Sequence, residues 1–552
     1  MSGSNPLPVW CRDLVELYES GAANQFILYG NVEDRFLLPG GPPPRLGSLT
    51  DFLRDTLLGS FDIVLGYDVG NGIRVEKGSD MFSDWPYLKE NPQLPRQPRG
   101  AIETLTHYFR YCANWARAGG PKRRIACVLR SAQLFAPPMQ TGFNADTNAL
   151  ALLMRDWSSD MLLTEYPLAT FLATSTLNDL HPFLARNPRA AAIEIPMLAA
   201  DAYASTLASL TPAYTVALGG SKADLAGAGA QLAGASLSSV ERLLRTLEHR
   251  KAPLTSADLV DLKKRSVELD SDGLIEFLQP ERTLADVHGQ DALKKWLRQD
   301  LTLWSQGDVE ALPKGYLLCG PVGTGKTFMV ECLAGEANVP VVKLKNFRDM
   351  WVGSTEGNLE KIFRLVHALG KCMVFVDEAD QALGRRQAAS GDSGTSGRVY
   401  GMIAEEMGSS RNRGRLIWVL ASSRPDLIEV DLKRPGRVDV KIPILPTSTP
   451  EEGFALIRAL CGKRKVEIDA GAIDGLRGRI PDRLTPGAAE ALAVKVYRLV
   501  RTENRAPIDA LRAALDDYRP AVPPEVMEMQ IQLAVSEASD ASFIPQAFRA
   551  RG

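Results

Sequence analysis

Short apolar runs recur along the chain and predict its β-strands. Each run is bounded by glycine, proline or charged residues and lacks a regular alternation of apolar and polar positions. Such runs are typical of strands in a parallel sheet that is buried on both faces. The predicted strands are residues 26–29, 61–65, 125–129 and 169–174 in the first half, and 315–319, 339–344, 372–376 and 416–421 in the second.

Between these runs, apolar residues recur at the three-to-four-residue spacing of one helix face. The clearest stripes are Leu293, Trp296, Leu297 and Leu301; Leu359, Ile362, Phe363 and Val366; and Val399, Met402, Ile403 and Met407. Strands that alternate with helices predict a doubly wound α/β fold, present once in each half of the chain.

Changes in composition divide the chain into five predicted parts. Residues 39–44 are rich in proline and glycine, and residues 218–236 are rich in glycine and alanine, so both interrupt regular structure. From Arg519 the sequence is typical of a linker that is followed by a short helical end. The predicted domains are a first α/β core at residues 1–215 and a second at 279–447, each followed by a separate segment, at 216–278 and at 448–518, and a tail at 519–552.

Length, charge and cysteine content narrow the class of protein. A chain of 552 residues predicts roughly two to four domains. The 64 basic and 66 acidic residues give a formal charge of −2, so a nucleic-acid partner is not expected. The seven cysteines are far apart and form no CxxC pair, and the sequence has neither a basic leader nor a run of 18 apolar residues. We therefore expect a cytoplasmic protein with no membrane partner.

One glycine-rich segment has the pattern of a phosphate-binding loop. Residues 320–327 read GPVGTGKT, follow a predicted strand and open a predicted helix, which is the context that GxxxxGK[ST] requires. Backbone N–H groups of such a loop face phosphate oxygens. Lys326 is predicted to contact the β- and γ-phosphates of ATP, and Thr327 to ligate Mg²⁺. The predicted nucleotide contacts here are Gly320, Pro321, Val322, Gly323, Thr324, Gly325, Lys326, Thr327 and Phe328.

Two acidic residues end the apolar strand 372–376, about fifty residues after this loop. Asp377 is predicted to hold the Mg²⁺ shell, and Glu378 to polarise the attacking water as a general base. Alone, an apolar strand that ends in two acids is more often a solvated strand end. Its spacing from the phosphate loop favours the metal and base roles, and the two motifs together predict a Mg²⁺-dependent ATPase.

Further segments accompany these motifs, and in this order they resemble the AAA clade of AAA+ ATPases. They lie between Arg282 and Ala493: residues 285–289 resemble the segment beside adenine, 350–356 the aromatic pore loop, 421–426 the sensor-1 stretch, 433–439 the arginine-finger segment and 484–489 the nucleotide-contacting part of the lid. The resemblance implies that residues 216–278 and 448–518 are a first and a second helical lid. It also implies a homo-oligomeric ring, usually of six subunits, with each ATP site at a subunit boundary.

The resemblance also implies roles for individual residues around the nucleotide. Val287 and His288 would lie beside adenine, while Gly487 and Ala488 would contact the nucleotide from the lid. Ser423 stands at the sensor-1 position, where the family usually has asparagine. Its hydroxyl can still orient water, but over a shorter reach.

Two arginines would complete the site of a neighbouring subunit. Arg434 and Arg437 match the arginine-finger segment, and a guanidinium fork suits the charge that develops on a transferred phosphoryl group. The alternative is ordinary surface pairing of these arginines with Asp431 and Asp439.

The pore-loop resemblance rests on Trp351, Val352 and Gly353, which would line an axial pore and grip an extended polypeptide. The alternative for Trp351 is packing in the core, as is common for a large apolar side chain. Residues 390–397 are small and polar, and a second pore loop or a connecting loop explains them equally well.

The first half repeats the order of elements without the chemistry. The segment that starts at Gly30 has no GK[ST], and Glu33 and Asp34 would repel phosphate there. Arg130 and Ser131 follow the strand 125–129, in place of the metal and base acids. We expect a degenerate AAA+ module that cannot hydrolyse ATP, with an unrelated α/β adaptor domain as the alternative. The tandem arrangement resembles an AAA family known as a conserved reading frame in algal plastids and cyanobacteria.

The leading functional hypothesis is an ATP-hydrolysing ring that threads or remodels an unidentified protein client, with hydrolysis in the second half only. The alternative is a nucleotide-controlled switch or assembly scaffold that does not thread its partner. None of the five histidines belongs to an HExxH motif, so a fused zinc protease, as in one membrane-bound branch of the clade, is excluded.

Overall fold

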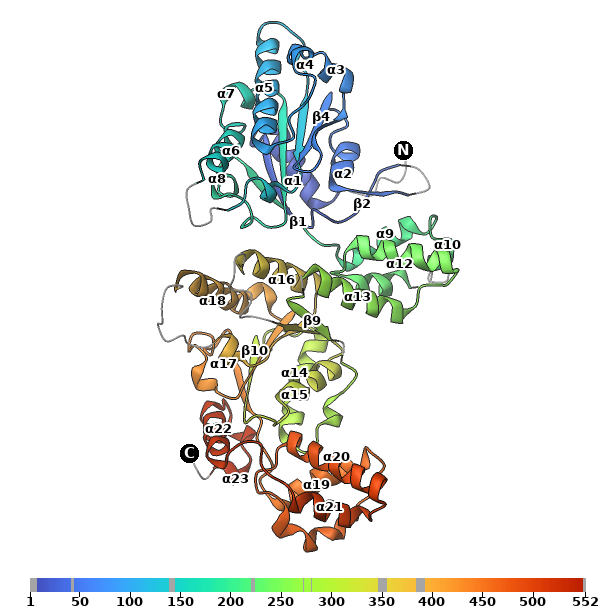
Figure 1. Cartoon of the computed structure of the whole chain (residues 1–552), viewed down its shortest axis with the longest axis vertical. Coiled ribbons are helices and arrows are strands. Elements are labelled where there is room, and N and C mark those ends of the chain that lie inside the picture. The colour runs from blue at the N-terminus through green and yellow to red at the C-terminus, as the bar shows by residue number, and fades with distance from the viewer. Residues whose placement is uncertain are drawn as a thin grey trace. The chain divides into compact units, whose positions relative to one another are not determined.

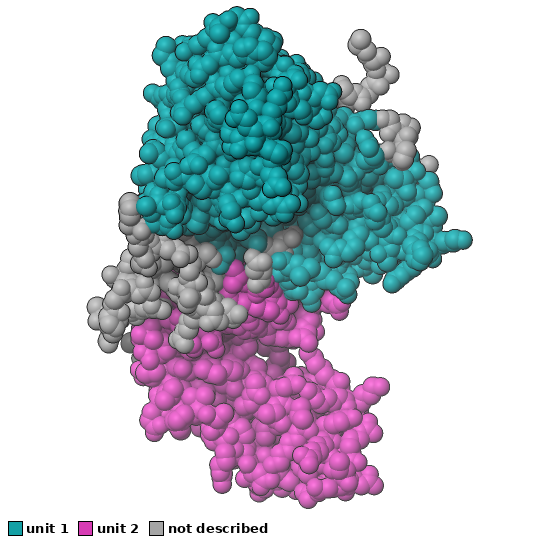
Figure 2. Space-filling view, turned by 45° about the horizontal axis from the view of Figure 1, so that its top comes forward, with its two compact units in different colours: residues 1–271, 354–369 teal, residues 272–353, 370–552 magenta. Residues whose placement is uncertain are grey.

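The computed structural model describes residues 7–40, 44–138, 144–219, 224–271, 273–278, 280–345, 355–383 and 393–549 (Figure 1). Of residues 270, 355, 356 and 393–399 it describes the backbone alone. The chain divides into two compact units, coloured separately in Figure 2. Unit 1 is residues 1–271 together with 354–369, and unit 2 is residues 272–353 together with 370–552.

Unit 1 contains eight strands among its described residues: β1 (Gln25–Gly30), β2 (Phe36–Leu37), β3 (Leu46–Gly47), β4 (Ile63–Asp68), β5 (Gly72–Lys77), β6 (Ile125–Leu129), β7 (Leu168–Thr174) and β8 (Ala191–Ile195). Its helices are α1 (Val9–Glu19), α2 (Leu49–Thr56), α3 (Ser79–Ser83), α4 (Pro86–Glu90), α5 (Pro98–Arg117), α6 (Ala145–Asp156), α7 (Met161–Thr164), α8 (Pro182–Ala185), α9 (Ala200–Leu210), α10 (Thr215–Gly219), α11 (Leu225–Leu232), α12 (Leu237–Arg250), α13 (Ser256–Asp270) and α16 (Thr355–Leu369).

The main sheet of unit 1 has the strand order β5-β4-β6-β7-β1-β8. All neighbours pair in parallel except β4 and β5, which form an antiparallel edge. Every residue of β6 and β7 is buried, as the unbroken apolar runs in their sequences predict. Separate apolar clusters pack on the two faces of the sheet, one containing Trp157 and the other Trp10.

Unit 2 contains six strands among its described residues: β9 (Ile275–Leu278), β10 (Gly315–Cys319), β11 (Val341–Leu344), β12 (Cys372–Val376), β13 (Leu416–Ser422) and β14 (Val440–Pro443). Its helices are α14 (Asp291–Gln306), α15 (Lys326–Glu336), α17 (Ala379–Ala382), α18 (Ser393–Gly408), α19 (Pro450–Gly462), α20 (Pro486–Glu503), α21 (Pro507–Asp516), α22 (Pro524–Glu537) and α23 (Gln546–Arg549).

The sheet of unit 2 has the order β14-β10-β13-β12-β11-β9, with β9 antiparallel to β11 and every other pair parallel. When the five parallel strands of each unit are numbered in chain order, the two sheets have the same strand order. Strand β10 corresponds to β1, β12 to β6, and β13 to β7. The structure confirms the predicted α/β class, with two sheets that are parallel apart from one antiparallel edge each.

Each core is followed by a separate helical cluster. In unit 1, helices α9 to α13 bury a core that contains Tyr203 and Leu244. In unit 2, helices α19 to α21 bury another that contains Phe454 and Leu511. Strand β9 lies within residues 216–278, the predicted first lid, but it pairs with β11 of the second sheet.

All eight predicted apolar runs form strands, with ends shifted by at most three residues. The three predicted helix stripes lie on α14, α16 and α18. None of the helices among the described residues has the length and apolar character that crossing a bilayer requires.

Candidate active site

The glycine-rich segment forms a tight loop between β10 and α15 of unit 2. Its first residue, Gly320, lies close to the segment that follows β14. A Cβ at this position would lie 2.0 Å from the carbonyl oxygen of Ile444. At the end of the loop Gly325 has φ +85°, a left-handed conformation that glycine adopts without strain, and α15 starts at the next residue. The helix N-terminus therefore opens at the carboxyl end of β10, where a phosphate can meet its free N–H groups.

Lys326 is folded over this loop. Its Nζ donates hydrogen bonds to the carbonyl oxygens of Gly320 (2.8 Å) and Pro321 (2.9 Å). Burial lowers the pKa of Lys326, while the nearby carboxylate of Asp377 opposes that shift. A partly buried ammonium held by neutral carbonyl groups is well suited to exchange them for an anionic ligand.

Thr327 and Asp377 come together from α15 and from the end of β12. The Thr327 hydroxyl lies 3.2 Å from Asp377 Oδ2 and donates a hydrogen bond to it. An alcohol oxygen and a carboxylate at one point fit Mg²⁺, which prefers oxygen ligands and completes its octahedron with waters and phosphates. The Nζ of Lys343, on β11, lies 2.9 Å from the same Oδ2. Sequence reasoning missed this ion pair because Lys343 stands outside every motif.

Glu378 follows Asp377 in a left-handed conformation, with φ 47° and ψ 47°. Such a conformation is costly for a residue with a side chain and is found most often at functional sites. Its carbonyl accepts hydrogen bonds from the N–H groups of Gln381 and Ala382, while its side chain is exposed at the strand end. An exposed carboxylate beside the predicted metal ligands can reach a water molecule.

The sensor-1 segment leaves β13 beside the phosphate loop. Ser422, the last residue of β13, donates a hydrogen bond from its hydroxyl to Asp380 Oδ1 (2.6 Å) and accepts one from the Arg424 N–H (2.9 Å). The predicted residue, Ser423, is half-buried, and its hydroxyl makes no hydrogen bond to another described residue. The structure therefore fixes Ser422 and leaves the Ser423 hydroxyl without a protein partner in the described region.

The helical cluster of unit 2 contacts the loop directly. The Gly487 N–H donates a hydrogen bond to the Gly323 carbonyl (2.9 Å), and Thr485 caps α20 by accepting from the Ala488 N–H. The predicted lid residues thus lie against the phosphate loop. A side chain at position 487 would put its Cβ 3.3 Å from the Gly323 carbonyl oxygen.

The predicted adenine-binding residues follow a short 3₁₀ turn at Leu284–Asp286. Val287 is buried, and its carbonyl accepts a hydrogen bond from Lys294 Nζ (3.1 Å). Partial withdrawal from water lowers the pKa of His288, and the positive charge of Lys294 adds to this effect. Phe328, another predicted contact, packs with the Arg282 guanidinium 5.3 Å from its ring centroid.

The two predicted finger arginines differ in exposure. Arg434 is 59% exposed and pairs with Asp431 Oδ1 at 3.0 Å. Arg437 is 13% exposed, ion-pairs with the Asp431 carboxylate and donates to the Asp431 carbonyl at 3.0 Å. Arg434 can leave its partner more easily, because an exposed ion pair is weak.

The predicted pore-loop residues Trp351, Val352 and Gly353 lie outside the described residues. Of the small polar segment 390–397, residues 393–397 form the start of α18, and residues 390–392 also lie outside the described part.

Helix α22 from the C-terminal tail also reaches the site. It packs against β10, β14 and the 3₁₀ turn Pro425–Leu427. Its buried Gln530 accepts a hydrogen bond through Oε1 from the N–H of Val322, in the phosphate loop (3.3 Å). At its end, Glu537 pairs with Lys433 and with Lys441 (3.0 Å). Sequence reasoning expected only a linker and a short helical end here, because nothing in the local pattern indicates which surface the helix covers.

Comparisons with known proteins match two regions of the chain. Residues 2–196 match the family model of the AAA+ chaperone N-terminal Rossmann-like domain, and residues 316–445 match the ATPase family associated with various cellular activities (AAA).

Among curated proteins, the chain is 32% identical over 229 residues to the ATP-dependent zinc metalloprotease FtsH of Mycobacterium leprae (strain TN). The aligned region covers 39% of this chain and 28% of that protein. It is 32% identical over 245 residues to the protein of that name from Caldicellulosiruptor bescii, which covers 42% of this chain and 39% of that protein. The matches thus span well under half of either relative. Taken together, these matches show that residues 2–196 are similar to an AAA+ chaperone N-terminal Rossmann-like domain and that residues 316–445 are similar to an AAA domain.

Proposed function

We propose that unit 2 hydrolyses ATP with Mg²⁺ and that the protein uses this reaction, as a homo-oligomeric ring, to remodel protein clients. The observation that carries the proposal is the convergence of Lys326, Thr327, Asp377 and Glu378 at the carboxyl end of one parallel sheet. These residues combine a phosphate-binding ammonium, two oxygen ligands for a metal and an exposed carboxylate next to them.

Each residue has a separate task in this proposal. The loop N–H groups and Lys326 bind the phosphates, and Lys326 exchanges the carbonyls of Gly320 and Pro321 for phosphate oxygens. Thr327 and Asp377 would hold Mg²⁺, which would supply positive charge to offset that of the phosphates. Glu378 accepts the proton of the attacking water, and Ser423 orients that water. Gly487 and Ala488 bring the lid to the nucleotide.

Hydrolysis is proposed for unit 2 alone. At the corresponding strand end of unit 1, Arg130 stands in the place of Asp377, and Ser131 in the place of Glu378. Neither side chain can ligate a cation as a carboxylate does or act as a general base at neutral pH. Unit 1 therefore serves as a non-hydrolysing module of a tandem arrangement.

A ring of subunits, usually six in this class of ATPase, would complete the site. Arg434 is the better-placed finger because it is exposed, whereas Arg437 would first have to leave Asp431. Client remodelling rests on the resemblance of residues 350–356 to an aromatic pore loop. All seven cysteines are buried, and thiols shielded in this way fit a reducing compartment such as the cytoplasm.

The named activity of the FtsH relatives includes a zinc protease, but the present sequence has no HExxH motif. Among the residues that the structure describes, no cluster of three histidine, cysteine or acidic side chains could hold a metal ion. Proteolysis is therefore not part of the proposal.

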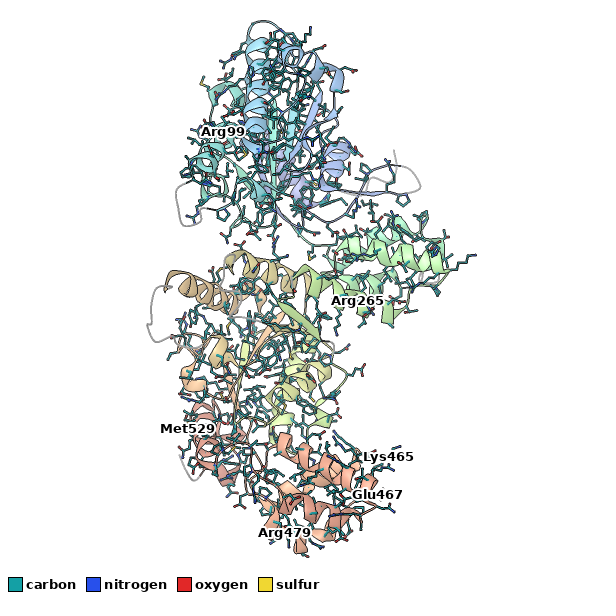
Figure 3. The ribbon with its side chains drawn as sticks, viewed as in Figure 1. Arg99, Arg265, Lys465, Glu467, Arg479 and Met529 are labelled. Carbon is teal, nitrogen blue, oxygen red and sulfur yellow. The ribbon has the colours of Figure 1, made fainter. Side chains whose placement is uncertain are left out.

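Glu378→Gln tests the proposed base. The variant should bind ATP with unchanged affinity while its kcat for ATP hydrolysis falls by about 100-fold or more, because the amide cannot accept the proton. Glu467→Gln is the matched control, since Glu467 is an exposed glutamate of the lid, labelled in Figure 3. Steady-state phosphate release and equilibrium ATP binding are measured on both. Hydrolysis by Glu378→Gln at the rate of the control would contradict the assignment.

A further inference from the structure

Unit 1 holds a cavity at the place that corresponds to the phosphate site of unit 2. The cavity, of about 590 Å³, lies at the carboxyl ends of β1, β6 and β7, between the loop after β1 and helix α12. Its volume is in the range of sites that bind small molecules. Strands β1 and β6 have the places in their sheet that β10 and β12 have in unit 2.

The backbone at the end of β6 repeats the catalytic geometry of unit 2. Ser131 has φ 49° and ψ 51°, and Glu378, which follows β12 at the same spacing, has φ 47° and ψ 47°. The two units therefore share an unusual left-handed residue at equivalent positions. The residue before it differs in charge: Arg130 lines the cavity of unit 1 where unit 2 has the predicted metal ligand Asp377.

On one side the cavity is bounded by helix α12. Asp34, from the loop after β1, is buried and accepts hydrogen bonds from the N–H groups of Leu237 and Ser238 (both 2.8 Å) at the start of α12. A carboxylate at a helix N-terminus is stabilised by the free N–H groups and the helix dipole. The negative charge of Asp34, which the sequence suggests would repel phosphate, is thereby offset.

Among the charged residues at the cavity, two arginines remain available to bind an anion. Glu241 is paired with Arg245 (2.6 Å) and Arg35 (3.8 Å). Arg130 is 3.9 Å from Asp68, which has a closer partner in Arg74 (3.1 Å). Arg242 lines the cavity, and its guanidinium makes no ion pair or hydrogen bond within the described residues. Glu33 adds one acidic group, which accepts a hydrogen bond from Ser131.

We propose that this cavity binds a small molecule that carries a phosphate group, held by Arg130 and Arg242 without Mg²⁺. The guanidinium fork matches phosphate oxygens, and a fixed cation at position 130 makes a metal ion unnecessary. The ligand is bound and not cleaved, because the strand end offers no general base. The site is independent of the ATPase activity that we propose for unit 2.

The test is calorimetric titration of the full-length chain in EDTA, in a Lys326→Ala background that weakens the site in unit 2. The probes are ADP and pyrophosphate. We expect one binding event per chain, and at least a tenfold weaker affinity when Arg130→Gln and Arg242→Gln are added. A preference of more than tenfold for ADP would identify a nucleotide site, and equal affinities a site for the phosphate group alone.

The controls separate binding from folding. Arg99→Gln changes an exposed arginine of α5 that pairs with Glu103 and does not line the cavity (Figure 3), so it should leave the affinity unchanged. Arg242→Lys keeps the charge but not the fork, and should give an intermediate affinity even if the double substitution impairs folding. The absence of binding by both probes, or equal affinities with and without the two arginines, would overturn the proposal.

Discussion

At the residue scale, the carboxylate of Asp377 has two partners in the site. Its Oδ2 atom accepts a hydrogen bond from Thr327 and forms an ion pair with Lys343. Mg²⁺ would need that oxygen, so Lys343 must yield when the metal binds. The lysine thus holds the carboxylate in position while it also competes with the metal for the negative charge.

Lys343→Met should strengthen Mg²⁺ binding. A partly exposed ion pair contributes about 1 kcal/mol at most, so the Mg²⁺ concentration for half-maximal ATPase activity should fall by up to roughly fivefold. Lys465→Met, at an exposed lid position labelled in Figure 3, is the control for loss of one positive charge. The measurement is ATPase rate against Mg²⁺ concentration. A higher Mg²⁺ requirement in Lys343→Met than in the control would contradict the competition.

The sequence predicts the residues of the site that belong to spaced motifs. Lys326 and Thr327 follow from the loop pattern, and Asp377 and Glu378 from the acidic strand end. The partner of Asp377 could not be predicted, because Lys343 lies in an apolar run of a different strand and only sheet pairing brings the two together. The unequal exposure of Arg434 and Arg437 likewise depends on how the chain turns around Asp431.

At the element scale, helix α22 belongs to the site although it lies far along the sequence from the phosphate loop. Gln530 offers a buried amide oxygen to a phosphate-loop N–H, and Glu537 joins the helix to two lysines. Although burial raises the pKa of Glu537, hydrogen bonds to Lys433 and Lys441 outweigh it, and the pKa lies below its ordinary value. The helix is therefore held at its middle and at its C-terminal residue, and Gln530 acts as a positioning residue for the loop.

Gln530→Ala should loosen the phosphate loop without changing the chemistry. Loss of one hydrogen bond contributes about 1 kcal/mol, so the KM for ATP should rise by roughly fivefold, while kcat stays near its original value. Met529→Ala is the control, because Met529 is the adjacent residue of the same helix and is 37% exposed (Figure 3). Equal KM values for the two variants would show that the contact does not position the loop.

Central elements could be predicted and edge elements could not. The fully buried strands β6, β10, β12 and β13 are unbroken apolar runs. The edge strands β8 and β14 are only partly buried, so their sequences carry a weaker signal. The local sequence of α22 also does not predict where the helix packs, because its packing depends on contacts with strands more than 80 residues away.

At the scale of the whole molecule, two units with one strand order carry different chemistry. Unit 2 combines a glycine-rich loop with two acidic residues at a strand end, whereas unit 1 has an arginine and a serine at the equivalent strand end and a lid fastened by Asp34. The shared fold explains the shared backbone geometry, and the different side chains are the basis of our proposal that unit 2 alone hydrolyses ATP. A site completed by Arg434 of a neighbouring subunit would make that hydrolysis a property of the assembly.

Mixing two inactive variants tests whether each ATP site is shared between neighbouring subunits. Lys326→Ala removes the phosphate-binding ammonium, and Arg434→Ala removes the finger, so each variant alone should lose most of its ATPase activity. In a mixture, an intact pocket from an Arg434→Ala chain can meet an intact finger from a Lys326→Ala chain, and random mixing in a ring restores about a quarter of the sites at most. We predict that ATPase activity reappears on mixing, up to that level. Full activity of Arg434→Ala as an isolated monomer, or no recovery in mixed oligomers, would contradict the account.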